Sequence, residues 1–224
     1  MKNFYQKLQT ETEQARAELL SAPIIQDCFQ GDITLEAYIG FLTQAFHHVK
    51  QTVPLLMACG SRLRDDQEWI RAAVVEYIDE EYGHHEWILN DIAVCGGDKE
   101  VVRKGQASEP VAMMVAYLND AIARVNPLAI FGMVQVLEGT SVALATNAAH
   151  LIADQLSLPK MAFSYLASHG SLDVDHLKFF EKLMNQIENE ADQEVIIETA
   201  NRVYKLYGDM LRGLPRATEN KQAA

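Results

Sequence analysis

Residues 127–145 read PLAIFGMVQVLEGTSVALA, and this stretch decides the fold class. Its residues are apolar or small on nearly every side of a helix, which is typical of a helix buried at the centre of a protein. Pro127 suits the first turn of such a helix, and the helical pattern continues to about residue 155. We therefore predict a central helix over about 127–155, long enough to span a small domain.

Glu138 is the only ionisable residue in that stretch. A lone carboxylate in apolar surroundings either stays protonated or meets a positive charge. Two interpretations of Glu138 are therefore open. It is a ligand to a cation, or it is a structural acid paired with an arginine or a tyrosine.

The segments on both sides of this helix also repeat at helical spacing, and strand alternation is hard to find. We predict an all-α, single-domain bundle of seven or eight helices over residues 1–215, followed by a disordered tail over 216–224, whose only apolar residues are alanines. The main helices are expected at about 2–20, at 34–63 with Thr34 as N-cap and a bend at Pro54, and at 66–94, 111–125, 127–155, 171–189 and 191–213. Shorter ones are expected after Pro23 and at 159–168. The stretch 98–110 is expected to hold a linker or a short helix.

The charge of the chain excludes some partners. Acidic residues number 31 and basic residues 19, so the formal net charge is −12. Nucleic acids and anionic membrane surfaces both require a basic surface, so neither is expected as a partner. The three cysteines, Cys28, Cys59 and Cys95, fit a reducing compartment, and no secretory signal or membrane span is expected. A cytoplasmic location is predicted.

A second candidate group lies on the predicted helix 66–94, whose positions three and four apart form a mostly apolar face. Glu81 and His84 fall on this face, where an ionised carboxylate is costly unless it is paired or bound to a cation. His85 is the alternative to His84, because it lies four residues after Glu81. Glu80 is expected on a solvated face, but the choice between Glu80 and Glu81 stays open.

A third candidate group is His169-Gly-Ser-Leu-Asp173-Val-Asp-His176. Asp173 and His176 are expected on one face of the helix that starts near Ser171, and His169 lies just before it. Two imidazoles and a carboxylate at these spacings are typical ligands for a divalent metal.

The three groups together supply three carboxylates and three imidazoles, which suit two iron ions, or two manganese ions, with one carboxylate bridging. A ferritin-like bundle would need another acid one helix before Glu81. The stretch between Glu36 and Asp65 contains no acidic residue, which favours a different helical scaffold. The predicted metal ligands are Glu81, His84, Glu138, His169, Asp173 and His176.

The chain resembles the haem-oxygenase-like di-iron oxidases, a family that includes TENA/THI-4/PQQC-like proteins and iron-containing redox enzymes. The resemblance covers about residues 20–190. Its sharpest motifs are FHHVKQTVP at 46–54, EEYGHHEW at 80–87, and the His-x3-Asp-x2-His set that ends at His176. It implies a haem-oxygenase-like bundle in which the same six residues hold two non-haem iron ions.

The resemblance also implies an activity. A non-haem di-iron oxidase or oxygenase would use O2 and a reductant to oxidise a small organic substrate that is fatty-acid-like, amino-acid-like or derived from one of its own side chains. A homodimer is expected. Residues expected to line the pocket or to support the ligands are His47, His48, Tyr77, Tyr82, His85 and Tyr165.

Three alternatives remain. A metal-free TenA-type thiamin-salvage hydrolase would use a cysteine nucleophile, and the stretch 127–155 has none. A PqqC-like cofactorless oxidase would need basic residues, whereas the candidate group here is rich in acids. A non-catalytic metal- or ligand-binding helical protein is the alternative of another class, and consumption of O2 with a reductant distinguishes it from an oxidase.

Overall fold

The computed structural model describes residues 3–216, and within that range the side chains of residues 169–175 are not described. Every regular element in the described part of the chain is helical, which confirms the all-α prediction. The helices are α1 (Phe4–Glu11), α2 (Glu13–Leu20), α3 (Pro23–Gln30), α4 (Leu35–Gly60), α5 (Glu68–Glu81), α6 (His84–Val94), α7 (Lys99–Lys104), α8 (Glu109–Asp120), α9 (Ile130–Leu156), α10 (Ser164–Met184) and α11 (Glu190–Arg212). Short 3-10 or π turns lie at Asp65–Gln67, Ala121–Val125, Pro127–Ala129 and Lys160–Phe163.

The predicted central helix is α9 together with the 3-10 turn that precedes it. Residues 130–136 of α9 are all buried, and α9 packs along both α10 and α11. The stretch Pro127–Leu156 is long and apolar enough to cross a membrane by length and composition, but 56% of its most apolar window is buried inside the protein. That burial is typical of a core helix.

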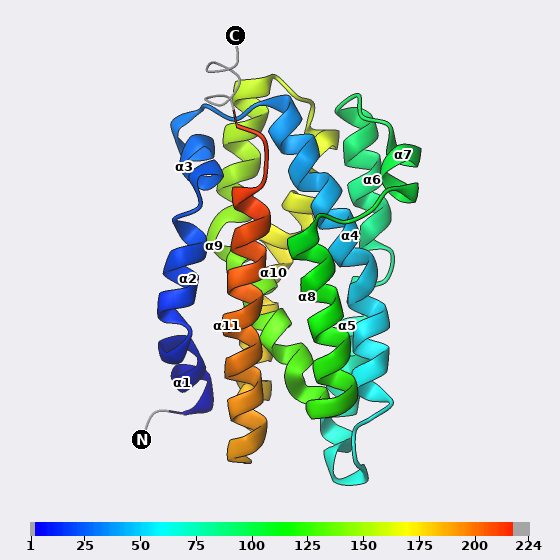
Figure 1. Ribbon diagram of the computed structural model, residues 1–224, viewed down its shortest axis with the longest axis vertical. Helices are drawn as coiled ribbons and strands as arrows, with labels where there is room; N and C mark the ends of the chain where they lie inside the picture. Colours follow the sequence, from blue (N-terminus) through cyan, green and yellow to red (C-terminus); the bar gives the residue numbers. More distant parts are fainter. Residues whose placement is uncertain (1–2, 217–224) are drawn as a thin grey trace.

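The helices α9 and α11 approach each other closely at Gly132. A β-carbon added to Gly132 would lie 2.7 Å from the backbone nitrogen of Ala200 and 2.7 Å from the carbonyl oxygen of Ile196. The two helices therefore meet backbone to backbone here, which only glycine permits. Figure 1 shows α11 crossing in front of α9 and α10, with α2 on one side and α8 on the other.

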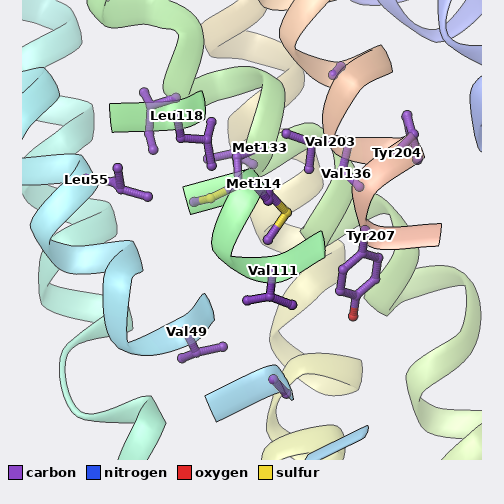
Figure 2. Packing of buried hydrophobic residues seen from close by; sticks show 14 of the residues in the cluster. Val49, Leu55, Val111, Met114, Leu118, Met133, Val136, Val203, Tyr204 and Tyr207 are labelled. Carbon is purple, nitrogen blue, oxygen red and sulfur yellow. The ribbon is translucent and has the colours of Figure 1, made fainter. Parts of the chain in front are cut away.

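The core between α4, α8, α9 and α11 is filled by aliphatic and aromatic side chains (Figure 2). Met114 of α8, Met133 of α9 and Val203 of α11 gather at its centre, and each is 2% exposed or less. Burial of this kind stabilises the fold at about 25 cal/mol per Å² of apolar surface removed from water.

The structure has eleven α-helices among the described residues, more than the seven or eight predicted. Two of the predicted helices are divided. The N-terminal helix is interrupted at Thr12, whose hydroxyl donates to the carbonyl oxygen of Leu8 at 2.8 Å. The predicted helix 66–94 is interrupted at Gly83, which adopts a left-handed conformation with φ of 92°. The stretch 98–110, expected to hold a linker or a short helix, contains the short helix α7 with Asp98 as its N-cap.

At α10, two predicted helices form one. The sequence predicts one helix ending near Ser168 and another starting at Ser171, but α10 runs without interruption through both positions. Its start is fixed from outside by Asp91, a fully buried residue of α6. Asp91 accepts hydrogen bonds from the backbone nitrogen of Ser164 at 3.1 Å, from that of Tyr165 at 2.9 Å, and from the Ser164 hydroxyl.

Asp91→Ala is expected to destabilise the protein by about 2 kcal/mol, the upper end of the cost of removing a helix N-cap. The reason is that two backbone N–H groups at the start of α10 lose their acceptor in a buried place. Urea unfolding measures the change, with Asn90→Ala, an exposed position on the same helix, as control. Equal midpoints for the two variants would contradict this role for Asp91.

The C-terminal part of the described chain is tied to α3. Arg216 donates to the Asp27 carboxylate at 2.6 Å from Nε and at 2.8 Å from Nη2, although the sequence assigns Arg216 to the tail. Residues 217–224, the rest of the predicted tail, lie outside the described residues.

Candidate metal centre

A small cavity of about 50 Å³ lies between α4, α5, α9, α10 and α11. Glu81 at the end of α5, Glu138 in the middle of α9 and His176 in α10 all line it. The fold therefore brings together three of the predicted ligands from three different helices. The remaining lining residues are His48, Val49, Thr52, Leu56, Tyr77, Met133, Val134, Leu137, Ser141, Tyr165 and Tyr207.

His84, a fourth predicted ligand, lies beside Glu81. The Nδ1 atom of His84 is 3.3 Å from Oε2 of Glu81, and the imidazole is buried and stacked on Trp87. The sequence argument placed both side chains one turn apart on a single helix. In the structure Glu81 is the last residue of α5 and His84 the first of α6, so the turn at Gly83 sets their separation.

Glu138 lies where α9 passes the cavity. The residue is half-buried, and its Oε2 atom is enclosed by protein. The cavity lining described here contains neither lysine nor arginine. A carboxylate at such a place favours a nearby cation, because burial of an ionised acid is costly unless a positive charge offsets it.

His176 has a partner that the sequence interpretation missed. Its Nε2 atom lies 3.3 Å from Oε1 of Glu80, a residue expected on a solvated face. The Glu80 side chain is 35% exposed, so it is partly solvated and also contacts His176 where α5 and α10 meet. Periodicity along one helix cannot reveal such a contact between two helices.

His169 and Asp173, the last two predicted ligands, have side chains outside the described residues. The sequence predicts His169 in a loop just before the helix. In the structure the backbone at both positions is helical, so this prediction was wrong for His169. Among the described side chains, no three His, Cys, Asp or Glu residues lie close enough together to hold one metal ion. The assignment of six ligands therefore stays a prediction.

Three of the residues expected around the ligands line the cavity. These are His48, Tyr77 and Tyr165, and each is buried. The Tyr77 hydroxyl has no hydrogen-bond partner among the described residues. Burial, and next the charge of Glu138, raises the pKa of Tyr77 far above its ordinary value. The phenol is therefore neutral and keeps its proton at neutral pH.

The other three lie elsewhere. His47 is buried but does not line the cavity, and burial followed by the nearby Lys50 lowers its pKa. The His85 Nε2 atom lies 3.5 Å from Glu86 rather than beside Glu81. Tyr82 is 75% exposed, which contradicts its expected pocket position, because α5 ends one residue before it and turns its ring to solvent.

The donors around the cavity fit divalent metal ions. Carboxylate oxygens and imidazole nitrogens are the ligands that iron and manganese prefer. The electrostatic field in the cavity also favours cations. The negative charges of nearby carboxylates, which add to burial in raising the pKa of Tyr77, attract positive ions to the same space. The volume suits ions with a few bound atoms, because a site for one water molecule needs about 10–15 Å³.

The architecture that holds these donors is the haem-oxygenase-like fold, as predicted. A domain of unknown function with a haem oxygenase-like fold from Shewanella denitrificans has a TM-score of 0.85 at 19% identity, over 99% of this chain and 94% of that one. A TenA homologue from Pseudomonas syringae pv. tomato has a TM-score of 0.76 at 12% identity, over 93% and 90%. Haem oxygenase-1 from the cyanobacterium Synechocystis, solved in complex with haem, has 0.74 at 12%, over 99% and 96%.

Identities this low show the fold alone, whereas the sequence itself shows the family. Residues 39–208 match the family of iron-containing redox enzymes, and the chain belongs to it. The matched range includes all the predicted metal ligands. No curated protein matches the sequence.

Proposed function

We propose that this protein is a non-haem di-iron enzyme that uses O2 and a reductant to oxidise a small organic substrate. The observation that carries the proposal is the convergence of Glu81, Glu138 and His176 on one small cavity, with His84 in contact with Glu81. Membership of the iron-containing redox enzyme family supports iron as the metal. Two iron ions bound here would supply the site for O2 activation.

The residues around the cavity would have different roles in holding the metal ions. Glu81 and Glu138 would offset the charge of the two ions, and His84 and His176 would coordinate through imidazole nitrogen. Glu80 lies 3.3 Å from His176 and can orient that ring, as carboxylates commonly do for metal-bound histidines. Tyr77 keeps a proton on its hydroxyl and can donate it in a hydrogen bond to an anionic group in the cavity.

The size of the cavity favours metal ions over haem. A volume of about 50 Å³ admits a few atoms, whereas pockets for cofactor-sized ligands occupy roughly 300–1,000 Å³. The TenA-type hydrolase is also disfavoured. Burial raises the pKa values of Cys28, Cys59 and Cys95, the last two to about 12 and about 11, so the thiols stay protonated and are poor nucleophiles.

Glu81→Gln tests the proposal, because it removes the charge of one predicted ligand and keeps its shape. The wild type is expected to bind two Fe(II) ions per chain in an anaerobic titration, and Glu81→Gln fewer than two. Glu76→Gln, at an exposed position on the same helix, is the matched control and is expected to bind two.

The iron-loaded wild type, mixed with oxygenated buffer and a reductant, is expected to consume O2 faster than free Fe(II) at the same concentration. Circular dichroism checks that the variants keep the helical fold. Two ions bound by Glu81→Gln would remove Glu81 from the site. A wild type that binds iron and consumes no O2 above the free-iron rate would identify a metal-binding protein instead.

A further inference from the structure

A second, larger cavity of about 120 Å³ lies between α3, α4, α9, α10 and α11. Its walls are aliphatic and aromatic, with Ile24 of α3, Phe41 of α4, Leu144 of α9 and Leu211 of α11 among the side chains that form them. Phe29, another lining residue, is 41% exposed, so the cavity reaches the surface beside α3.

None of the described residues that line this larger cavity carries a charge. It has few polar groups. One of them already makes a hydrogen bond within the protein, and another is a thiol that keeps its proton. The Tyr38 hydroxyl donates to the carbonyl oxygen of Ala162 at 2.7 Å, and burial raises the pKa of the Cys28 thiol. A charged group placed here would lose its hydration without gaining a partner, which is costly. The cavity therefore selects an uncharged, apolar group.

The two cavities are neighbours. Leu137, Ser141, Tyr165 and Tyr207 line both of them. Leu137 and Ser141 belong to α9 and flank Glu138, so a molecule seated in the larger cavity would extend toward that carboxylate. Tyr207 is buried at the same boundary, with its ring edge-on to His48 at 5.6 Å between centroids.

The size of the larger cavity sets the size of the group. An engineered apolar cavity of about 150 Å³ stays dry and binds benzene. A cavity of about 120 Å³ is somewhat smaller, so it encloses an apolar group of up to roughly six carbon atoms in a chain or a ring. A longer chain would reach the opening beside Phe29.

We propose that the larger cavity binds the apolar end of the substrate, an uncharged hydrocarbon group of this size, while the polar end of the same molecule reaches the metal cavity. The class of substrate is thus a small amphiphile with one metal-binding head and one apolar tail. A free amino acid with a charged side chain does not fit. The assignment of the head rests on the proposed di-iron function, whereas the binding of the tail does not.

Ala145→Leu tests the binding of the tail, because Ala145 is a buried lining residue of α9 and the added carbons occupy the cavity. The probe is octan-1-ol, titrated calorimetrically into metal-free protein. Wild type is expected to bind it, and Ala145→Leu at least tenfold more weakly. Ala143→Leu, an exposed position on the same helix, is the matched control and is expected to bind like wild type. Ala148→Leu fills the same cavity and replaces Ala145→Leu if that variant does not fold.

The iron-loaded protein tests the head. Octanoate is expected to bind wild type more tightly than acetate does, and the cavity-filling variant is expected to lose that difference while retaining the wild-type iron content. Equal binding of octan-1-ol by wild type and the filled variant would overturn the proposal, as would equal affinities of wild type for octanoate and acetate. A wild type that binds octan-1-ol but no iron would support the apolar site and overturn the di-iron function.

Discussion

Glu138→Ala is expected to lower the bound iron from two ions per chain to one or none. Glu138 comes from the central helix, lines the small cavity and is the one acid among residues 127–145, so no neighbour on α9 can replace its carboxylate. The helical fold should be kept, because an alanine favours helix formation at this half-buried position. Metal analysis after anaerobic Fe(II) loading measures the iron, and circular dichroism measures the helix.

The control for Glu138→Ala is Asp154→Ala, which removes an exposed acid from the same helix and should leave two ions bound. Two irons per chain in Glu138→Ala would exclude Glu138 as a bridging ligand. A lower iron content in both variants would show that any loss of an acid from α9 weakens iron binding, which would contradict a specific role for Glu138.

Gly132→Ala is expected to cost about 3 kcal/mol of unfolding free energy, the upper part of the range for overpacking. The added carbon would lie 2.7 Å from backbone atoms of α11, and backbone cannot turn aside as a flexible side chain can. The higher helix propensity of alanine, about 1 kcal/mol, does not offset this. In a protein of this size the loss lowers Tm by roughly 6–12 °C, measured by thermal unfolding of the metal-free protein.

Gly139→Ala, seven residues further along α9, is the matched control for the helix crossing. Its added carbon would meet the side chains of Gln135 and Tyr204 at 3.7 and 3.9 Å, which is ordinary van der Waals contact. This variant should be neutral or slightly stabilised. Similar Tm values for Gly132→Ala and Gly139→Ala would show that α9 and α11 can separate at little cost.

The fold class could be predicted from the sequence because α9 is apolar on nearly every side, and only a helical bundle buries such a segment. The boundaries of α10 could not be predicted from the sequence. Asp91 fixes its start, and Asp91 is 73 residues away from Ser164 in the chain. The Gly170-Ser171 pair resembles a helix end locally, but a glycine inside a helix costs only about 1 kcal/mol.

The convergence of Glu81, Glu138 and His176 could be anticipated from single side chains, because each is ionisable at a position that periodicity assigns to the core. The proximity of Glu80 to His176 could not be anticipated, since it depends on how α5 packs against α10. The sequence also gave no indication that Tyr207 lies at a cavity. Its buried ring fits the apolar face of α11, and only the structure shows that it borders both cavities.

The break at Gly83 has a consequence for how this centre can vary. In a continuous helix each inserted residue rotates everything beyond it by about 100°. Between α5 and α6 an insertion would instead lengthen a turn and leave both helices in phase with the bundle. A longer or shorter turn here would therefore change the position of the His84 imidazole relative to the Glu81 carboxylate without repacking the core.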